Sequence, residues 1–245
     1  ELFLTDDPAR ARVLAAELEE ANELRRAEDA RTLEEALELL SRSYDPERDF
    51  GVVLAREGWH PGVIGIVASR VVERIHRPVI MVALEEGRGR GSARSIAGVH
   101  LYQALQGCAS HLDRFGGHRQ AAGLDLPEAE LEPFRSAFSQ AVEEQLGGIP
   151  PLPALQPELE LPVEEATEEI HRLVEHMAPF GMGNRRPLFR ARGARVAGTP
   201  RVVGKDHLKL RLAPGNGGRG ADLEAIGFGL ASRVPPATLS GASVD

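Results

Sequence analysis

The sequence predicts an α/β domain that follows a long helix and precedes a mostly β domain. Three observations lead to this prediction. Residues 6–41 hold few helix breakers, strands alternate with helices over residues 50–148, and a proline-rich break occupies residues 149–153. The break is the best candidate for a linker. We therefore place the regions at residues 1–45, 46–150 and 151–245.

The first region resembles a connector. Asp6 and Asp7 provide an acidic cap and Pro8 stands in the first turn, so a helix is expected from there to about Ser41. Leu14 and Leu18 lie on one face, but the heptad that they begin continues onto charged positions, and a long coiled coil is not expected.

The α/β region is assigned from apolar runs and turn signals. We expect strands at 50–55, 78–84 and ending at 126, helices at 63–76, 99–109 and 127–147, and a Gly/Arg-rich loop at 87–95. Beyond the linker, we expect a strand at 155–161, a helix at 164–177, and strands at 188–189, 192–196, 208–212 and from 226. These short strands predict a small barrel, which residues 231–245 leave incomplete because they show no pattern.

Composition is that of a soluble globular protein, with 42% apolar and 27% charged residues. The one cysteine, Cys108, excludes an internal disulfide and fits a reducing compartment; on an apolar helix face it is expected in the core. No apolar run could span a bilayer, and no secretion leader is visible. Because the sequence starts at Glu1 without Met, we expect it to be cut from something longer.

Charge is unevenly distributed along the chain. The net charge is −8, yet residues 180–212 hold nine Arg and Lys residues against Asp206 alone. A basic face of this kind favours nucleic-acid binding, while alternating arginines on a sheet are also typical of a solvated surface. Charge alone supports the two interpretations equally.

Three motifs hold residues suited to binding phosphate: 58–70 with His60, 88–95 with Ser92 and Arg94, and 115–123 with His118. Glycines allow close backbone approach, and Ser, Arg and His donate to phosphate oxygens. Each motif alone is also typical of an ordinary turn, and Trp59 is better explained by core packing than by base stacking. No metal-ligand pattern is present.

The order and spacing of these motifs are more specific than any one of them. Residues 59–70, 77–80, 91–96, 100–105, 115–118 and 121–123 together resemble the DHHA1 domain of the RecJ exonuclease family. The helix at 5–41 resembles that family's connector, and residues 155–230, including 179–187, resemble its OB-fold. The implied fold is an α/β DHHA1 domain between a long connector helix and a partial, mostly β OB-fold.

The resemblance implies the substrate-binding portion of a 5′→3′ exonuclease that degrades single-stranded DNA in recombination and repair. Two Mn²⁺ or Mg²⁺ ions would be bound by an N-terminal DHH domain that this chain lacks, so the chain alone is expected to be inactive. Single-stranded DNA is the implied partner, with single-stranded-DNA-binding protein and a helicase as further candidates. The implied location is the cytoplasm of a bacterium, at the nucleoid, with no membrane contact.

The resemblance also implies roles for particular residues. His118 would contact a phosphate in the catalytic cleft. The terminal 5′-phosphate and neighbouring nucleic acid would be bound by Ser92, Arg94, Ser95, Arg90, Gly116, Gly117 and His60. The groove for the DNA strand would be lined by Arg185, Arg186, Arg190, Arg192, Lys205 and Lys209. Within this chain, no residue is assigned to a metal.

Two alternatives remain at this point. One is a DHHA1 phosphoesterase that acts on short oligonucleotides or cyclic dinucleotides; such enzymes generally lack an OB-fold. The other is a non-catalytic module that binds single-stranded DNA, for which no preference for a 5′-phosphate is expected.

Overall fold

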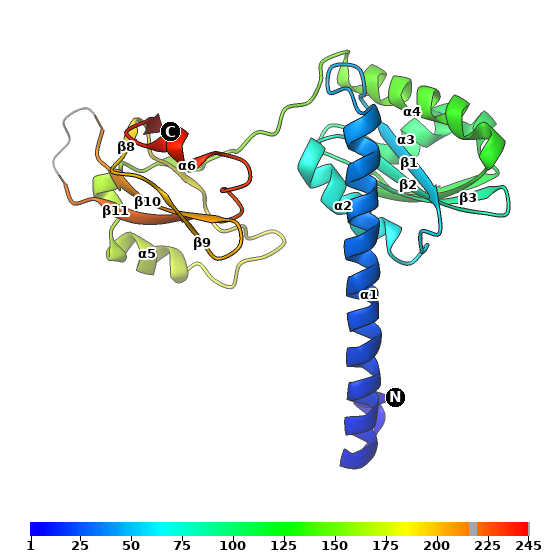
Figure 1. Cartoon of the computed structure of the whole chain (residues 1–245), viewed down its shortest axis with the longest axis horizontal. Helices are drawn as coiled ribbons and strands as arrows, with labels where there is room; N and C mark the ends of the chain where they lie inside the picture. Colours follow the sequence, from blue (N-terminus) through cyan, green and yellow to red (C-terminus); the bar gives the residue numbers. More distant parts are fainter. Residues whose placement is uncertain (216–219, 245) are drawn as a thin grey trace. The chain divides into compact units, whose positions relative to one another are not determined.

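The computed structural model describes residues 1–215 and 220–244. Figure 1 shows a long helix, an α/β domain and a smaller β-rich domain along the chain. The chain divides into two compact units, residues 1–153 and 154–245, and the division falls in the proline-rich segment. The long helix belongs to the first unit.

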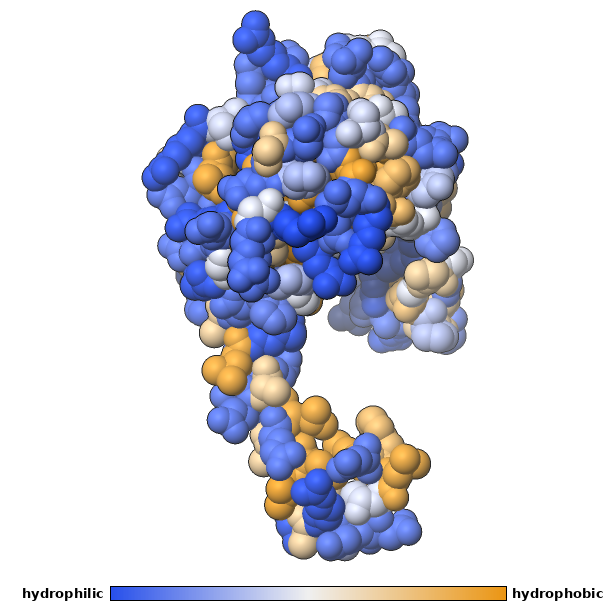
Figure 2. Space-filling model, turned by 90° about the vertical axis from the view of Figure 1, so that its right-hand side faces the viewer, coloured by the Kyte–Doolittle hydropathy of each residue, from blue (hydrophilic) through white to orange (hydrophobic). Residues whose placement is uncertain are grey.

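Helix α1 spans Pro8–Ser43. Asp7 caps it, with its carboxylate accepting the N–H of Ala9 at 2.8 Å, and Pro8 occupies the first position. Only the C-terminal half is buried, through Asp29, Thr32, Ala36 and Leu40. The N-terminal half, preceded by a 3₁₀ turn at Leu2–Leu4, is exposed, and Figure 2 shows apolar side chains on this end of the helix. The expected connector is therefore a helix anchored at one end.

A five-stranded sheet forms the body of the first unit. Its strands are β1 (Val52–Glu57), β2 (Val79–Glu85), β3 (Arg88–Arg94), β4 (Arg114–Gly117) and β5 (Ala121–Pro127). The order is β1-β2-β3-β5-β4, and β1 pairs with β2 in parallel while the other pairs are antiparallel. The parallel pair is connected through α2 (Ile64–Ile75), as a parallel crossover requires.

Each face of this sheet packs against its own helices. On one face, α3 (Leu101–Gly107) and α4 (Leu131–Leu146) build a core around Phe134 and Phe138 that reaches all the way to β5. On the other face, α1 and α2 cover Val52, Leu54, Val79 and Met81 of β1 and β2. The core on that second face includes no residue of β3, β4 or β5, so this half of the sheet has an open surface next to α2. Short 3₁₀ turns lie at Ala109–His111 and Glu128–Glu130.

Strand β3 lies where the sequence predicts a loop, and that prediction was wrong. Gly89, Gly91 and Ala93 face the α3–α4 core, and at the two glycines the neighbouring side chains leave no room for a Cβ. A Cβ on Gly89 would lie 2.6 Å from Val82 Cγ1, and one on Gly91 would lie 2.8 Å from Leu124 Cγ. Exposed and buried positions therefore alternate along β3 as in other strands. The buried positions, however, hold glycine or alanine where a larger apolar side chain usually marks the buried face.

The second unit is mostly β. Helix α5 (Glu168–Glu175) is capped by Thr167, and β10 (His207–Ala213) pairs with β11 (Leu223–Gly227) along one edge and with β9 (Arg201–Val203) and β8 (Ala194–Val196) along the other. A separate parallel pair joins β6 (Leu159–Glu160) to β7 (Phe189–Arg190). Other short elements are a 3₁₀ turn at Val163–Glu165 and α6 (Pro236–Leu239).

Several local expectations for this unit need correction. The strand expected at 155–161 is reduced to β6, and β9 was not expected. The tail is also more ordered than its sequence suggests, because β12 (Ser243–Val244) pairs with β8. Residues 216–219 and 245 lie outside the described residues. Among the helices that the structure describes, none combines the length and apolar character needed to cross a bilayer.

Candidate phosphate-binding shelf

Strand β3 displays four polar side chains on the open half of the sheet. Arg88, Arg90, Ser92 and Arg94 alternate with the buried Gly89, Gly91 and Ala93. Because successive side chains of a strand point to opposite faces, these four share the face that α2 partly covers. The sequence therefore places a row of cationic and hydroxyl groups along one strand.

Glycines form the floor beside Ser92. In the sheet register, Ser92 lies opposite Gly123 of β5, which in turn lies opposite Gly116 of β4. A Cβ on Gly116 would meet nothing within 4 Å, and one on Gly123 would meet only the Gly91 carbonyl oxygen, at 3.8 Å. The two glycines thus leave open space above the backbone next to the hydroxyl. We call Ser92, Arg94, Gly116 and Gly123 the phosphate shelf.

Arg94 and Ser92 are held together at the edge of the shelf. The Arg94 Nη1 donates to Ser92 Oγ at 3.1 Å and to the Ala93 carbonyl oxygen at 2.8 Å. Gly65 of α2 closes the side of the shelf, since a Cβ there would lie 2.8 Å from Ser92 Oγ and 2.9 Å from Arg94 Nη2. The absence of a side chain at Gly65 therefore allows helix α2 to approach strand β3 closely.

Two other arginines on this face are neutralised by carboxylates, while Arg90 and Arg94 are not. Arg88 pairs with Asp113 at 2.7 Å, and Arg114 pairs with Asp125. Within residues 1–215 and 220–244, neither Arg90 nor Arg94 has a carboxylate within ion-pairing distance. Both guanidinium groups therefore keep a charge available to an external anion.

The β4–β5 hairpin ends the shelf at His118. Gly117 has a φ of +146°, and a Cβ there would lie 2.5 Å from the Ala121 carbonyl oxygen, so only glycine fits. The N–H of His118 donates to that same carbonyl at 2.8 Å, while its side chain is exposed. The hairpin loop is also fixed by the Ser95 N–H, which donates to the Gln120 carbonyl at 3.0 Å.

The Ser95 hydroxyl is bonded within its own turn. Its hydroxyl donates to the carbonyl oxygens of Val99, at 3.2 Å, and Ile96, at 3.3 Å. The hydroxyl therefore stabilises the turn between β3 and α3, and the structure gives it no position on the shelf.

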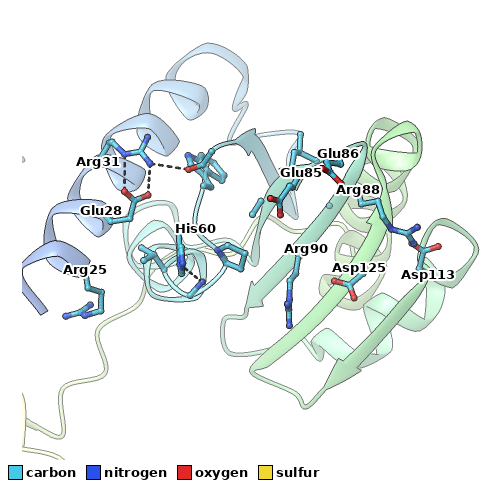
Figure 3. Close-up of a pocket in the computed structure, with 18 of the residues that line it drawn as sticks. Arg25, Glu28, Arg31, His60, Glu85, Glu86, Arg88, Arg90, Asp113 and Asp125 are labelled. Carbon is cyan, nitrogen blue, oxygen red and sulfur yellow. Dashed lines mark hydrogen bonds and ion pairs between the residues drawn. The ribbon is translucent and has the colours of Figure 1, made fainter. Parts of the chain in front are cut away.

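A large open cleft of about 1540 Å³ adjoins the shelf at the Arg88–Arg90 end of β3. Figure 3 shows Arg25, Glu28, Arg90 and His60 around it. His60 Nδ1 accepts the Gly62 N–H at 3.0 Å, which leaves the opposite ring nitrogen as the donor. Ser92, Arg94 and His118 do not line this cleft. The predicted residues Ser92, Arg94 and His118 thus lie apart from the cleft that Arg90 and His60 line, and they do not form a single pocket with them.

The expectation that Trp59 and Cys108 pack in the core is confirmed. Trp59 is buried, and its indole N–H donates to Glu35 Oε2 at 2.7 Å, so it anchors α1. Cys108 is fully buried, and burial raises the pKa of its thiol to about 11, which keeps it protonated and unreactive near neutral pH. Among the described residues, no group of three or more His, Cys, Asp or Glu side chains could hold a metal ion.

Several of the residues expected to line the groove for the DNA strand already form ion pairs within the second unit. Arg186 pairs with Glu175 at 2.6 Å and lies over the Phe180 ring, Arg192 pairs with Glu160 at 2.5 Å, and Lys209 pairs with Glu224 at 3.0 Å. Arg185 and Lys205 are exposed, and Arg190 lies on β7. Arg186, Arg192 and Lys209 therefore already face carboxylates, and β7 belongs to a different sheet from β10.

Sequence reasoning missed Gly123 as part of the shelf floor. It also missed the ion pairs that Arg88 and Arg114 form with Asp113 and Asp125. The available signal was the spacing of Arg88, Arg90, Ser92 and Arg94, whose period of two is that of a strand. Only the register shows that Gly123 stands between Ser92 and Gly116.

The fold defines a class: a DHHA1 domain followed by an OB domain. Residues 49–144 match the DHHA1 domain family, and residues 158–245 match the RecJ OB domain family. The expected fold class is confirmed.

The chain is similar to part of several RecJ exonucleases. The chain is 37% identical over 251 residues to the single-stranded-DNA-specific exonuclease RecJ of Escherichia coli, covering 96% of the chain and 41% of that protein. For RecJ of Bacillus subtilis, identity is 31% over 230 residues, covering 93% and 28%. The crystal structure of RecJ in complex with Mg²⁺ from Thermus thermophilus superposes with a TM-score of 0.72 at 32% identity, covering 92% of this chain and 36% of that one.

The chain thus contains a DHHA1 domain and a RecJ OB domain, as its motifs predict, and over most of its length it is similar to part of the RecJ exonucleases. It spans 28% of the Bacillus relative and 41% of the Escherichia relative.

Proposed function

We propose that this chain is the substrate-binding portion of a 5′→3′ exonuclease that degrades single-stranded DNA in recombination and repair. The observation that supports this most is the phosphate shelf. Ser92 and Arg94 present hydrogen-bond donors next to open glycine backbone, with no carboxylate paired to Arg94 among the described residues. The similarity to RecJ exonucleases supplies the class of substrate.

The shelf suits a terminal phosphate in particular. A phosphomonoester carries about −1.5 to −2 charges at neutral pH, against one charge for each internal phosphodiester. Arg94 uses Nη1 for the Ser92 and Ala93 oxygens, and its Nη2 lies beside Gly65. In this proposal the remaining guanidinium N–H groups and the Ser92 O–H donate to the terminal phosphate, since a hydroxyl that accepts one bond still has its proton to donate.

The glycines of β4 would let the rest of the DNA strand come close to the sheet. Gly116 and Gly117 allow a sugar-phosphate backbone to come close to β4, and His118 at the end of the hairpin would donate to the scissile or neighbouring phosphate. Arg90 and His60, which line the adjoining cleft, would contact nucleic acid further along. In the OB domain, Arg185, Arg186, Arg190, Arg192, Lys205 and Lys209 would attract the strand electrostatically.

Metal chemistry belongs to another part of the protein in this proposal. Similar structures are those of Thermus thermophilus RecJ in complex with Mg²⁺ and with Mn²⁺. The described residues of this chain provide no cluster that fits such an ion. We therefore assign two divalent ions to a DHH domain outside this chain, and the chain alone should release no nucleotides in Mn²⁺. The cytoplasm is the proposed location, at the nucleoid, with single-stranded-DNA-binding protein and a helicase as candidate partners.

Two other functions are less well supported. A phosphoesterase for short oligonucleotides or cyclic dinucleotides would share the shelf, but residues 158–245 match the RecJ OB domain, which favours a longer strand as substrate. A non-catalytic binding module would share the basic residues but would not discriminate between 5′ ends. The OB domain therefore favours the nuclease over the phosphoesterase, and a 5′-phosphate preference of the shelf would separate the nuclease from the binding module.

The test is Arg94→Ala, measured by fluorescence anisotropy with a single-stranded oligonucleotide that carries either a 5′-phosphate or a 5′-hydroxyl. Hydrogen bonds to charged groups contribute about 1.5–3 kcal/mol, so affinity for the phosphorylated end should fall about tenfold or more. Affinity for the hydroxyl end should change far less.

Arg88→Ala is the matched control, because Arg88 lies on the same strand and face but is paired with Asp113. It removes the same charge without removing a shelf donor. The proposal would be contradicted if Arg94→Ala lowered the affinity for both 5′ ends equally. It would also be contradicted if Arg88→Ala reduced the preference for the phosphorylated end as much as Arg94→Ala does.

A further inference from the structure

Three cations surround one carboxylate on a single face of the OB domain. Lys209 of β10 lies opposite Arg201 of β9, and Arg211 of β10 lies opposite Glu224 of β11. Directly opposed residues of antiparallel strands share a face, and so do residues two apart on one strand. All four side chains therefore extend from the same side of the sheet.

These residues line a small pocket of about 310 Å³. Its remaining wall is the connection between β8 and β9, which contributes Gly198 and Thr199. Gly198 has a φ of +74°, and a Cβ there would lie 3.7 Å from Arg211 Nη2, so the connection passes close to the guanidinium group. The β8–β9 connection therefore borders the pocket next to Arg211.

Glu224 is the anion in this pocket. Its Oε2 lies 3.0 Å from Lys209 Nζ. The hydrogen bond from Lys209 lowers the pKa of Glu224, and the charges of Lys209, Arg201 and Arg211 lower that pKa further. The carboxylate therefore stays ionised at neutral pH. Its side chain is 66% exposed and that of Lys209 is 33% exposed, and an ion pair so accessible to water is weak enough to be exchanged.

We propose that the pocket of Arg201, Lys209 and Arg211 binds a backbone phosphate of the DNA strand, and that Glu224 occupies it until the phosphate displaces the carboxylate. A phosphodiester carries the same single charge as a carboxylate and likewise presents two anionic oxygens, so both fit the guanidinium and ammonium donors. Glu224 would thereby compete with DNA for the pocket. The inference rests on the proposed function for its ligand, a single strand, and adds a site and a competitor to it.

A neighbouring aromatic side chain provides a surface for a base. His207 lies on β10 two residues before Lys209, and its ring contacts that of Phe228 edge-on, with centroids 5.3 Å apart. The Phe228 side chain is 79% exposed. A phosphate in the pocket would bring its nucleotide near this ring, and stacking of bases on exposed aromatics is how single-strand grooves bind without sequence preference.

The test is Glu224→Gln in the 245-residue chain, titrated with a fluorescein-labelled oligothymidine that carries a 5′-hydroxyl. Removing the competing carboxylate should tighten binding several-fold. Lys209→Gln should weaken binding and reduce the slope of log K against log salt by about one, as expected when one phosphate contact is lost. The same oligonucleotide with neutral methylphosphonate linkages should show no gain with Glu224→Gln.

Glu168→Gln is the matched control. Glu168 is also a glutamate of this unit in an exposed ion pair, with Arg172 of α5, which is not among the residues assigned to the DNA groove, and its side chain is 91% exposed. The change in net charge is identical. A gain confined to Glu224→Gln supports the proposal, whereas an equal gain for both variants overturns it, because the effect would then be one of overall charge. Thermal unfolding checks that both exposed variants fold.

The test of the OB pocket with Glu224→Gln is independent of the test of the phosphate shelf with Arg94→Ala. A 5′-hydroxyl oligonucleotide has no terminal phosphate, so the shelf's preference for that group does not enter the measurement. Loss of the Glu224→Gln gain would overturn the OB pocket even if Arg94→Ala behaves as the proposed function requires. A gain that persists while Arg94→Ala has no end-specific effect would overturn the shelf's role alone.

Discussion

The phosphate shelf and the OB pocket present cations to DNA in two different ways. On the shelf, Arg94 is fixed by Ser92 and by a backbone carbonyl, and it has no carboxylate partner among the described residues. In the OB pocket, Lys209 faces Glu224, and elsewhere in that unit Arg186 and Arg192 face Glu175 and Glu160.

This difference corresponds to two tasks. A cation held in one geometry without a counter-charge discriminates between ligands, since its donors match one arrangement of oxygens. Cations that exchange a carboxylate for a phosphate gain little from each contact, and such a surface suits a strand that must move past it. The comparison therefore predicts selectivity on the shelf and modest, salt-sensitive attraction in the OB domain.

The largest effect should come from Gly117→Ala, which breaks the shelf at its hairpin. The new Cβ would lie 2.5 Å from both the Ala121 carbonyl oxygen and the Ala122 Cα, at a φ of +146° that L-residues avoid. Strain of this kind costs about 1–3 kcal/mol before any clash is counted. We expect a clear drop in the urea midpoint of the first unit, measured by circular dichroism, together with loss of 5′-phosphate preference.

Gly116→Ala is the companion variant one residue earlier, where a Cβ meets nothing within 4 Å. Its stability should stay within about 0.5–1 kcal/mol of wild type. Binding should nevertheless weaken, because the methyl group would stand in the space that we assign to the DNA backbone. Unchanged binding by Gly116→Ala would show that the floor of the shelf does not approach DNA.

A smaller effect is expected from Gly65→Ala, which alters the shelf without changing its charge. The Cβ would displace Ser92 Oγ and Arg94 Nη2, both of which are ends of side chains that can move. Affinity for a 5′-phosphorylated oligonucleotide should fall a few-fold, while helix α2 should gain up to about 1 kcal/mol from replacing glycine.

The control for Gly65→Ala is Gly107→Ala in α3, where the nearest atom to a new Cβ is Ala141 Cβ at 3.8 Å. It tests the substitution of a helical glycine away from the shelf. If both variants bind the two kinds of 5′ end as wild type does, the position of Arg94 has no bearing on selectivity.

Much of the fold follows from the sequence because apolar runs and caps are local signals. The prediction of a helix from Asp6-Asp7-Pro8 is confirmed by α1, and the runs at 50–55 and 78–84 are β1 and β2. Strand β3 escaped prediction because its buried positions are Gly89, Gly91 and Ala93, which fit under Val82 and Leu124. A strand without inward apolar side chains has the composition of a loop.

The candidate site was predictable only in part, for a related reason. Ser92 and Arg94 could be named from their motif, but their juxtaposition with Gly116 depends on the order β3-β5-β4, which a local pattern does not contain. The net charge of residues 180–212 includes only the acidic residue inside that segment, and it omits the carboxylates that pair with the segment in the folded structure. Glu160, Glu175 and Glu224 lie outside that window in sequence and beside it in space.

The most direct test of the central claim is the ratio of affinities of the unmodified chain for 5′-phosphorylated and 5′-hydroxyl single strands of one sequence, measured across a range of salt concentrations. A shelf that binds the terminal phosphate with Ser92 and Arg94 predicts a preference of about tenfold or more for the phosphorylated end, while both affinities fall steeply with salt. A ratio of one at every salt concentration would contradict the account.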